Sequence, residues 1–386
     1  MRILMVLTYF QPYKSGLTVY AVRQAQALAA LGHQVTILTS QHDPALLLEE
    51  SDGGVHIVRL PVLFRLTKGV IMPKLPFKLW LLMRDADLVN LHVPQFEAGM
   101  ISVLAKLKRK PVVITYHCDL EMPTGWLNKL AGWVTHLMHR LSAGMADVIV
   151  HNTKDYAEHS SFLNHYLDKV AVIQPPVINA PFSDEDMLMF REKYKITSEQ
   201  RIIGMVARLA TEKGVEYLVQ AMPKILASIP NVRVIFVGAY KNVPGEERYQ
   251  QKLLPMIETL GDHWTFLGVV SEEEKSAFYA ACDVLALPSI NRTESFGMVQ
   301  VEAILCGTPV VATDLPGVRQ PIQETGLGII VPVKDVSALA DAIMDVLSMK
   351  MAVRPDVLAH LNRFYAPDTV ARAYEAVYQD VLRVHG

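Results

Sequence analysis

The chain has 386 residues, which is more than one ordinary hydrophobic core needs, so two domains are expected. Apolar residues make up 51% of the sequence and charged residues 20%, a composition typical of globular proteins that excludes a disordered chain. The formal net charge of −2 excludes a whole-protein attraction to nucleic acid, so no nucleic-acid partner is expected.

The cysteines Cys118, Cys282 and Cys306 are odd in number, and none belongs to a C-x-x-C pair. This argues against a disulfide framework and a structural zinc site, and a reducing environment fits best. The N-terminal MRILMVL is too short an apolar stretch for a signal peptide, and no segment has about 18 uninterrupted apolar residues. We therefore expect a cytoplasmic location, with any membrane contact peripheral on the cytoplasmic face.

The first half of the chain alternates short apolar runs with helical stretches. A helix is expected at Tyr20–Leu31, and strands at Arg2–Leu7, Gln34–Thr39, Val55–Leu60, Leu88–Leu91, Val112–Tyr116 and Asp147–Val150. Continuous apolar strands separated by helices are typical of a parallel sheet covered on both faces.

The same alternation restarts after Gln174-Pro175-Pro176, which makes a sensible linker. A helix is expected at Val215–Ile229, and strands at Ile202–Val206, Val232–Val237, Trp264–Leu267, Val284–Leu287 and Pro309–Ala312. The predicted fold class is α/β, with doubly wound parallel-sheet domains at residues 1–177 and 178–365 and a final helix within 366–386. In such sheets ligands bind at the carboxyl ends of strands, and a cleft is expected between the domains.

The loop from Gln11 to Thr18 joins the first strand to a helix and contains Gly16. Such a junction exposes backbone N–H groups at a helix start, which suits a phosphate, although an ordinary turn explains it equally well. The G-x-G-x-x-G pattern is absent here, which argues against a nicotinamide or flavin cofactor.

Two cations follow the first strand of the second half. Arg208 comes directly after the strand end, and Lys213 lies five residues later, at the start of the next helix. Two cations beside a helix N-terminus would neutralise a diphosphate. The alternative is a pair of solvated surface cations.

Two glutamates follow the strand Val284–Leu287. Glu294 lies on a loop, and Glu302 lies about two turns inside a helix expected at Met298–Leu305. Carboxylates are good acceptors for vicinal hydroxyls, so the two could bind a sugar and a ribose. The alternative is one loop glutamate and one helix-surface glutamate.

The run from Glu294-Ser295-Phe296-Gly297 through Glu302 to Gly307-Thr308-Pro309 resembles the E-x7-E signature of family 4 glycosyltransferases. Arg208-Leu209 and Lys213-Gly214 resemble the paired G-R-L and K-G element of the same family, and the resemblance covers nearly the whole chain. It implies the GT-B fold, with the last helix crossing back to the first domain. It also implies retaining transfer from a nucleoside-diphosphate sugar, which is a co-substrate, without a metal or another cofactor.

The resemblance assigns roles to individual residues. Arg208 and Lys213 would hold the diphosphate, Glu294 would bind sugar hydroxyls and Glu302 the ribose. His117, after the strand Val112–Tyr116, would contact the donor sugar near the reacting carbon. The rest of the implied donor site comprises Gly16, Val270, Ser295, Phe296, Gly297, Met298 and Val299.

One position departs from the family pattern. The family usually has two adjacent glycines in the first loop, whereas this chain has Ser15-Gly16. The close approach of this backbone to a phosphate is therefore in doubt.

On family frequency alone, the resemblance implies UDP-glucose as the first expected donor and GDP-mannose as the next, and a lipid, lipid-linked or glycan acceptor is expected. A UDP-sugar 2-epimerase or hydrolase would keep the diphosphate site but would not need an acceptor cleft. A non-catalytic nucleotide-sugar-binding subunit has the altered Ser15-Gly16 loop as its only support.

A segment rich in basic and large apolar residues suggests a membrane partner. Val55–Arg84 contains no acidic residue, and its basic residues are Arg59, Arg65, Lys68, Lys74, Lys78 and Arg84. Such a mixture suits an anionic bilayer surface, although core packing with solvated charges explains it equally well. Trp126–Leu141 is also amphipathic, and core packing is the favoured explanation for its apolar face.

Overall fold

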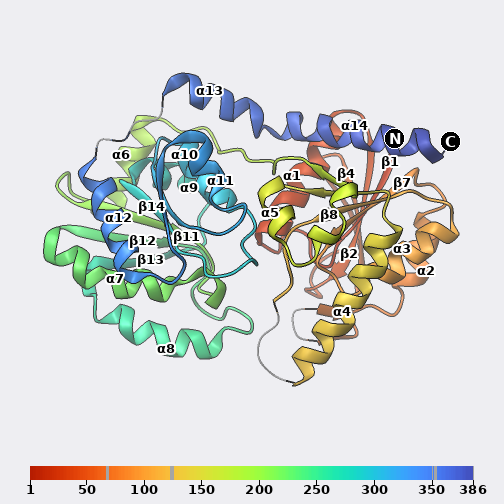
Figure 1. The fold of residues 1–386 in the computed structure, drawn as a ribbon, viewed down its shortest axis with the longest axis horizontal. Helices are drawn as coiled ribbons and strands as arrows, with labels where there is room; N and C mark the ends of the chain where they lie inside the picture. The colour runs from red at the N-terminus through yellow and green to blue at the C-terminus, as the bar shows by residue number, and fades with distance from the viewer. Residues whose placement is uncertain (67–68, 122–125, 350, 352–353, 386) are drawn as a thin grey trace. The chain divides into compact units, whose positions relative to one another are not determined.

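A computed structural model of the chain describes residues 1–66, 69–121, 126–349, 351 and 354–385. The chain divides into two compact units (Figure 1), one formed by Met1–Val177 with Phe364–Gly386 and the other by Ile178–Arg363. Every helix in the described ranges is too short or too polar to cross a membrane.

The first unit is built on an eight-stranded sheet with the order β10-β9-β8-β7-β1-β2-β4-β3. Its strands are β1 (Arg2–Val6), β2 (Gln34–Gln41), β3 (Glu49–Asp52), β4 (Val55–Pro61), β7 (Leu88–Val93), β8 (Val112–Tyr116), β9 (Val148–His151) and β10 (Val170–Val172). All neighbours are parallel except β3 and β4.

The expectation of a wholly parallel sheet is therefore wrong at this edge. β3 and β4 are joined by Gly53 and Gly54, whose φ angles of 55° and 79° suit a tight hairpin turn. A second, separate hairpin pairs β5 (Phe64–Leu66) with β6 (Gly69–Ile71). β4 was predicted, as Val55–Leu60, whereas β3, β5 and β6 were not, because these short strands are polar or mixed in sequence and form no apolar run.

The helices of the first unit include a segment from the far end of the chain. They are α1 (Gly16–Ala30), α2 (Leu75–Leu82), α3 (Ala98–Leu107), α4 (Trp126–Met145), α5 (Lys154–His159) and α14 (Pro367–His385). The last of these, α14, packs on α1 (Figure 1), where the hydroxyls of Tyr20 and Tyr374 lie 2.8 Å apart in the core.

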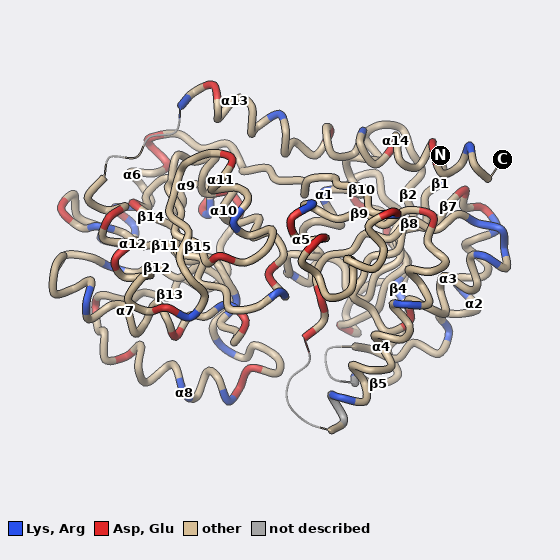
Figure 2. The backbone as a smooth tube through the Cα atoms, in the orientation of Figure 1, with Lys and Arg blue, Asp and Glu red and all other residues tan. Residues whose placement is uncertain are grey.

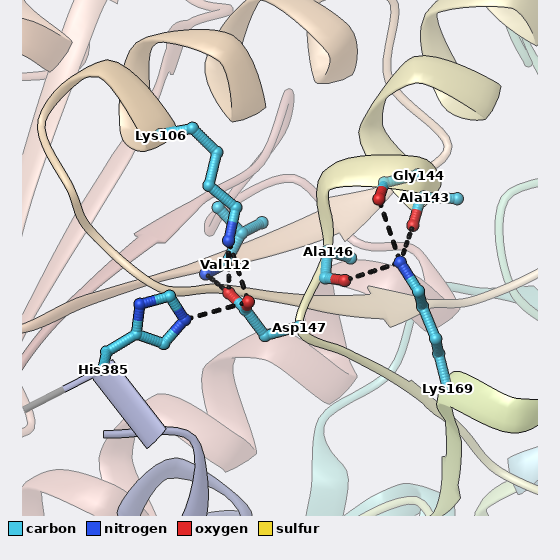
Figure 3. Close-up of polar contacts among 8 residues, drawn as sticks. All are labelled: Lys106, Val112, Ala143, Gly144, Ala146, Asp147, Lys169 and His385. Atoms are coloured by element: carbon cyan, nitrogen blue, oxygen red, sulfur yellow. Dashed lines mark hydrogen bonds and ion pairs between the residues drawn. The ribbon is translucent and has the colours of Figure 1, made fainter. Parts of the chain in front are cut away.

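Asp147, just before β9, ties several elements of this unit together (Figure 3). Its carboxylate accepts hydrogen bonds from Lys106 Nζ at 2.8 Å, from the Val112 N–H at 2.7 Å and from His385 Nε2 at 3.0 Å. Lys106 lies on α3 and His385 ends α14, so one carboxylate fixes the last turn of the chain to the sheet. Beside it, Lys169 Nζ donates to carbonyls at the end of α4, those of Ala143, Gly144 and Ala146.

The second unit has a wholly parallel six-stranded sheet with the order β13-β12-β11-β14-β15-β16. Its strands are β11 (Arg201–Val206), β12 (Val232–Val237), β13 (Trp264–Gly268), β14 (Val284–Leu287), β15 (Val310–Thr313) and β16 (Gly328–Val331). Its helices are α6 (Asp184–Lys193), α7 (Val215–Ser228), α8 (Glu247–Glu258), α9 (Glu272–Ala281), α10 (Met298–Leu305), α11 (Gln320–Thr325), α12 (Val336–Ser348) and α13 (Pro355–Phe364).

The strand order of the second unit reverses at one place. The chain runs outward from β11 to β13 and then returns to the other side of β11 to form β14. The loops that follow β11 and β14 therefore diverge from a topological switch point, the usual ligand position in doubly wound sheets. The predicted α/β class with doubly wound sheets is confirmed.

Candidate active site

The loops after β11 and β14 are locked together by backbone contacts. The Ile290 N–H donates to the Glu212 carbonyl at 3.0 Å. Gly214 adopts a φ of 62°, and a Cβ atom there would lie 2.0 Å from the Pro288 carbonyl oxygen. Only glycine satisfies both conditions, so the glycine of the K-G element has a structural reason at this position.

This interlock brings Lys213 and Glu294 together. Lys213 Nζ lies 2.6 Å from Glu294 Oε2, and their side chains are 22% and 13% exposed. The Ser289 hydroxyl donates to the same carboxylate oxygen at 3.3 Å. The ion pair thus fixes both functional groups at the carboxyl edge of the sheet. In the part of the chain that the structure describes, the second carboxylate oxygen, Oε1, makes no hydrogen bond and can accept hydroxyls.

Arg208 is held by a carboxylate that the sequence did not single out. Its Nη2 lies 3.0 Å from Glu212 Oε1, and the Arg208 side chain is 31% exposed. Glu212 itself is buried. Neither Arg208 nor Lys213 is therefore a fully solvated surface cation.

The loop after Glu294 is fixed from behind by buried contacts. Gly297, at a φ of 75°, precedes α10, and a Cβ atom there would lie 2.6 Å from Leu287 Cδ2. Gln300 Nε2 donates to the carbonyls of Phe296 at 2.5 Å and Val318 at 2.8 Å. Ser295 and Phe296 are buried, and Met298 and Val299 form the partly exposed first turn of α10.

Glu302 lies in the second turn of α10 and belongs to a different network from Glu294. Its Oε2 accepts a hydrogen bond from the Tyr279 hydroxyl at 2.9 Å and lies 3.3 Å from Lys275 Nζ. Glu302 is only 3% exposed, so it is not a helix-surface glutamate. Val270, partly exposed, follows the end of β13 in the same unit.

In the first unit, the departure at Ser15 has a local explanation. Ser15 is the N-cap of α1: its Oγ accepts the Thr18 N–H at 3.2 Å, and Thr18 Oγ1 accepts the Ser15 N–H at 2.8 Å. Its φ of −149° needs no glycine. The capping box explains why α1 begins at Gly16, four residues before the helix expected from apolar spacing.

His117 follows β8 and is buried against aromatic rings. Its Nε2 lies 3.0 Å from His92 Nδ1, and its ring meets the Tyr20 ring edge-on with centroids 4.9 Å apart. Burial, with smaller contributions from His92 and His151, lowers the pKa of His117 well below its usual value. The ring is therefore neutral at physiological pH.

Sequence reasoning missed Glu212, Tyr279, Lys275 and His92. His92 is part of β7, which runs two residues further than the predicted strand Leu88–Leu91. The available signal was a polar residue near the carboxyl end of a predicted buried strand, whereas the pairing of that strand with β8, which His117 follows, could not be read from the sequence.

The apolar face of α4 is exposed, so its expected core packing is wrong. Its residues are Trp126 (74% exposed), Leu130 (54%), Trp133 (65%), Leu137 (46%) and Leu141 (37%). The helix packs on α3 through its opposite side, where the hydroxyls of Ser102 and Ser142 lie 2.7 Å apart.

The basic segment Val55–Arg84 divides between core and surface. Arg59 is buried and pairs with Glu50 at 2.5 Å, so it adds no surface charge, and Lys78 pairs with Glu49 at 2.7 Å. Lys68 lies outside the described residues.

Leu75 and Leu79 are buried, as the core-packing alternative required, whereas the exposed apolar residues are Leu63, Phe64, Phe77, Trp80 and Leu81.

Comparison with known proteins assigns the chain to a family. Residues 15–176 match the family model of the glycosyl transferase 4-like domain, and residues 187–358 match the model of glycosyl transferases group 1. The chain belongs to the group 1, family 4-like glycosyltransferases. It is accordingly a glycosyltransferase of the hexosyltransferase type.

Relatives match over most of their length. The chain is 28% identical to the phosphatidyl-myo-inositol mannosyltransferase of Mycolicibacterium smegmatis, covering 90% of this chain and 85% of that protein. It is 25% identical to the D-inositol 3-phosphate glycosyltransferase of Corynebacterium glutamicum, covering 99% and 97%.

Solved structures show the same fold. Sucrose-phosphate synthase from Thermosynechococcus elongatus superposes with a TM-score of 0.80 at 20% identity, covering 99% of both chains. Anabaena HepE, in complex with UDP and glucose, gives a TM-score of 0.77 at 18% identity, covering 98% and 100%. The fold of this glycosyltransferase is therefore GT-B.

Proposed function

We propose that this glycosyltransferase transfers a hexose, with retention of configuration, from a nucleoside-diphosphate sugar to a lipid or lipid-linked acceptor. The observation that carries the proposal is the Lys213–Glu294 pair at the switch point between β11 and β14. A cation and a carboxylate held side by side match two adjacent parts of such a donor, the diphosphate and the polyhydroxylated sugar ring.

Each residue then has a defined task. Lys213 keeps N–H donors beyond the one given to Glu294 and places them, with Arg208, on the diphosphate. As the bond to the sugar breaks, negative charge grows on the departing diphosphate, and these cations stabilise it. Glu294 accepts hydrogen bonds from sugar hydroxyls through the oxygen that does not face Lys213.

The remaining donor contacts follow the family assignment. Glu302 binds the ribose, Val270 borders the base, and the backbone from Ser295 to Val299 lines the sugar and phosphate. In the first unit, His117 contacts the donor sugar, and Gly16 offers its backbone to the diphosphate. No metal or other cofactor is needed because Arg208 and Lys213 supply the positive charge, and we expect turnover to persist in EDTA.

UDP-glucose and GDP-mannose are the first donors to test. HepE was solved with UDP and glucose, and the Mycolicibacterium smegmatis relative is named as a mannosyltransferase. A thermal-shift panel of nucleotide sugars, followed by mass spectrometry of the product, identifies the donor and the acceptor. A free epimerised sugar or simple hydrolysis, with no transfer to any acceptor, would favour the epimerase or hydrolase instead.

The acceptor side is proposed to work at an anionic membrane surface on the cytoplasmic side. The exposed stripe of α4 carries two tryptophans and three leucines, and α4 has Lys129 and Arg140 but no acidic residue (Figure 2). Phe77 and Trp80 are exposed on α2. With the neighbouring Lys74 they add a second basic and apolar surface, within the basic segment Val55–Arg84. Indole rings and leucines insert at the headgroup level, and basic side chains attract anionic lipids.

Liposome flotation tests this surface. At low salt the wild-type protein should float with vesicles that contain anionic lipid, and the Trp126→Ala/Trp133→Ala variant should not float with them. The matched control is Leu188→Ala/Met189→Ala, which removes two apolar side chains of the second unit that are each 60% exposed. Equal flotation of all three proteins, or none by the wild type, would contradict the membrane proposal.

A further inference from the structure

A chain of hydrogen bonds behind His117 begins at Asn90, whose amide can face only one way. Its nitrogen lies 3.1 Å from the Val113 carbonyl oxygen and 3.0 Å from Thr115 Oγ1. Because a carbonyl can only accept, the amide nitrogen must face β8. The amide oxygen therefore faces the other way, where it accepts from Gln24 Nε2 at 3.3 Å and lies 3.2 Å from His92 Nε2.

The orientation of Asn90 fixes the tautomer of His92. An acceptor oxygen faces His92 Nε2, so that nitrogen must carry the proton. Burial lowers the pKa of His92 to about 3, so the ring is neutral and holds only one proton. His92 Nδ1 therefore has a lone pair.

The same argument then fixes His117. His92 Nδ1 lies 3.0 Å from His117 Nε2 and can only accept, so His117 Nε2 carries a proton. His117 is neutral too, which leaves its Nδ1 unprotonated. The ring is held in place by the stacked His92 ring, 5.2 Å away between centroids, and by the edge-on Tyr20 ring.

We propose that His92 is a positioning residue that, with Asn90, holds His117 in the tautomer with a proton on Nε2 and presents Nδ1 as a hydrogen-bond acceptor for a sugar hydroxyl. The substrate half of this inference rests on the proposed function. The tautomer half rests on the hydrogen bonds together with the burial that keeps both rings neutral. Within the described residues, His117 Nδ1 makes no hydrogen bond, so it is available to such a hydroxyl.

The direct test is nuclear magnetic resonance of the full-length protein with ¹⁵N-labelled histidine. The wild type should show His117 with a protonated Nε2 and an unprotonated Nδ1, assigned by loss of the signals in His117→Gln. His92→Leu should change this pattern because it removes the acceptor. His92→Asn should retain it because its side-chain oxygen stands where Nδ1 stood. A protonated Nδ1 in the wild type overturns the inference whether or not the protein turns over a donor.

Steady-state kinetics distinguish a positioning role of His92 from a purely structural role. His92→Leu should lower kcat about tenfold or more with a smaller change in donor KM, and His92→Asn should recover most of the loss. The control His139→Leu removes another buried neutral histidine of the same unit, one bonded to the Gln95 backbone, and should leave kcat unchanged. Equal kcat in His92→Leu and the wild type would overturn the positioning role. A wild type inactive with every donor would instead defeat the proposed function, while the resonance result still decides the tautomer.

Discussion

The carboxyl ends of β11 and β14 and those of β7 and β8 hold polar side chains in different ways. In the second unit, opposite charges hold each other, as Lys213 and Glu294 do, and they remain partly exposed. In the first unit, neutral side chains are linked by a buried series of hydrogen bonds that runs from Asn90 through His92 to His117. A charged pair is suited to a charged ligand, whereas a series of hydrogen bonds between neutral side chains controls the position of a single proton. Three substitutions and one change of pH test this difference.

The largest effect is expected for Lys213→Ala. The change removes a charge-assisted contact to the departing diphosphate, so donor turnover should fall on the order of 100-fold or more. The matched control is Lys224→Ala, whose Nζ lies 2.6 Å from Asp341 on a more exposed part of the same unit. Steady-state kinetics with the identified donor measure both, and equal losses in the two variants would contradict the site.

Glu294→Ala should also reduce turnover sharply, and the two losses should not add. Lys213 and Glu294 are in direct contact, so the double variant should be little worse than the worse single variant. A complete double-mutant cycle on kcat/KM measures this coupling. Fully additive losses would mean that the pair does not act as a unit.

Gly214→Ala should lower the stability of the second unit by about 2–5 kcal/mol. An alanine there pays for a left-handed φ, roughly 1–2 kcal/mol, and also clashes with the Pro288 carbonyl. Gly245→Ala is the matched control because Gly245 has a φ of 80° but nothing within 4 Å of a Cβ atom. Denaturant titration should separate the two variants, and equal losses would show that the interlocked loops tolerate displacement.

The smallest effect per group is expected from acidification. His92 has a pKa lowered by burial to about 3, and burial also lowers the pKa of His151 to about 4. Both stay neutral in the fold but take up protons near pH 6.5 when unfolded, so their stabilising contribution is complete above pH 6.5 and falls below it. At pH 5 the loss should be about 1–2 kcal/mol per histidine.

This loss should be confined to the first unit. Hydrogen exchange, corrected for intrinsic rates, should show β7 and β8 losing protection between pH 7 and pH 5 more than β11 and β12. An equal loss of protection in both sheets would contradict the presence of neutral, buried histidines in the first unit.

The sequence predicted the charged half of this comparison better than the neutral half. Lys213 and Glu294 lie in loops after apolar strands, where spacing and residue type are informative. His92 lies inside a strand, and its importance depends on which strand lies beside it, which local periodicity does not reveal. The same limit applies to Trp126 and Leu130. Their spacing predicted that they share one face of α4, but it could not predict whether another element covers that face.

An assay of donor turnover and product stereochemistry tests whether Lys213 supports retaining transfer to a lipid acceptor. Wild type, Lys213→Ala and Lys224→Ala are incubated with UDP-glucose or GDP-mannose and anionic vesicles that carry candidate lipid acceptors. Nucleotide release is followed, and the anomeric configuration of the glycolipid is read by nuclear magnetic resonance. Transfer with retention is expected for the wild type and Lys224→Ala, and a loss of turnover on the order of 100-fold is expected for Lys213→Ala. An inverted product, or wild-type rates in Lys213→Ala, would contradict it.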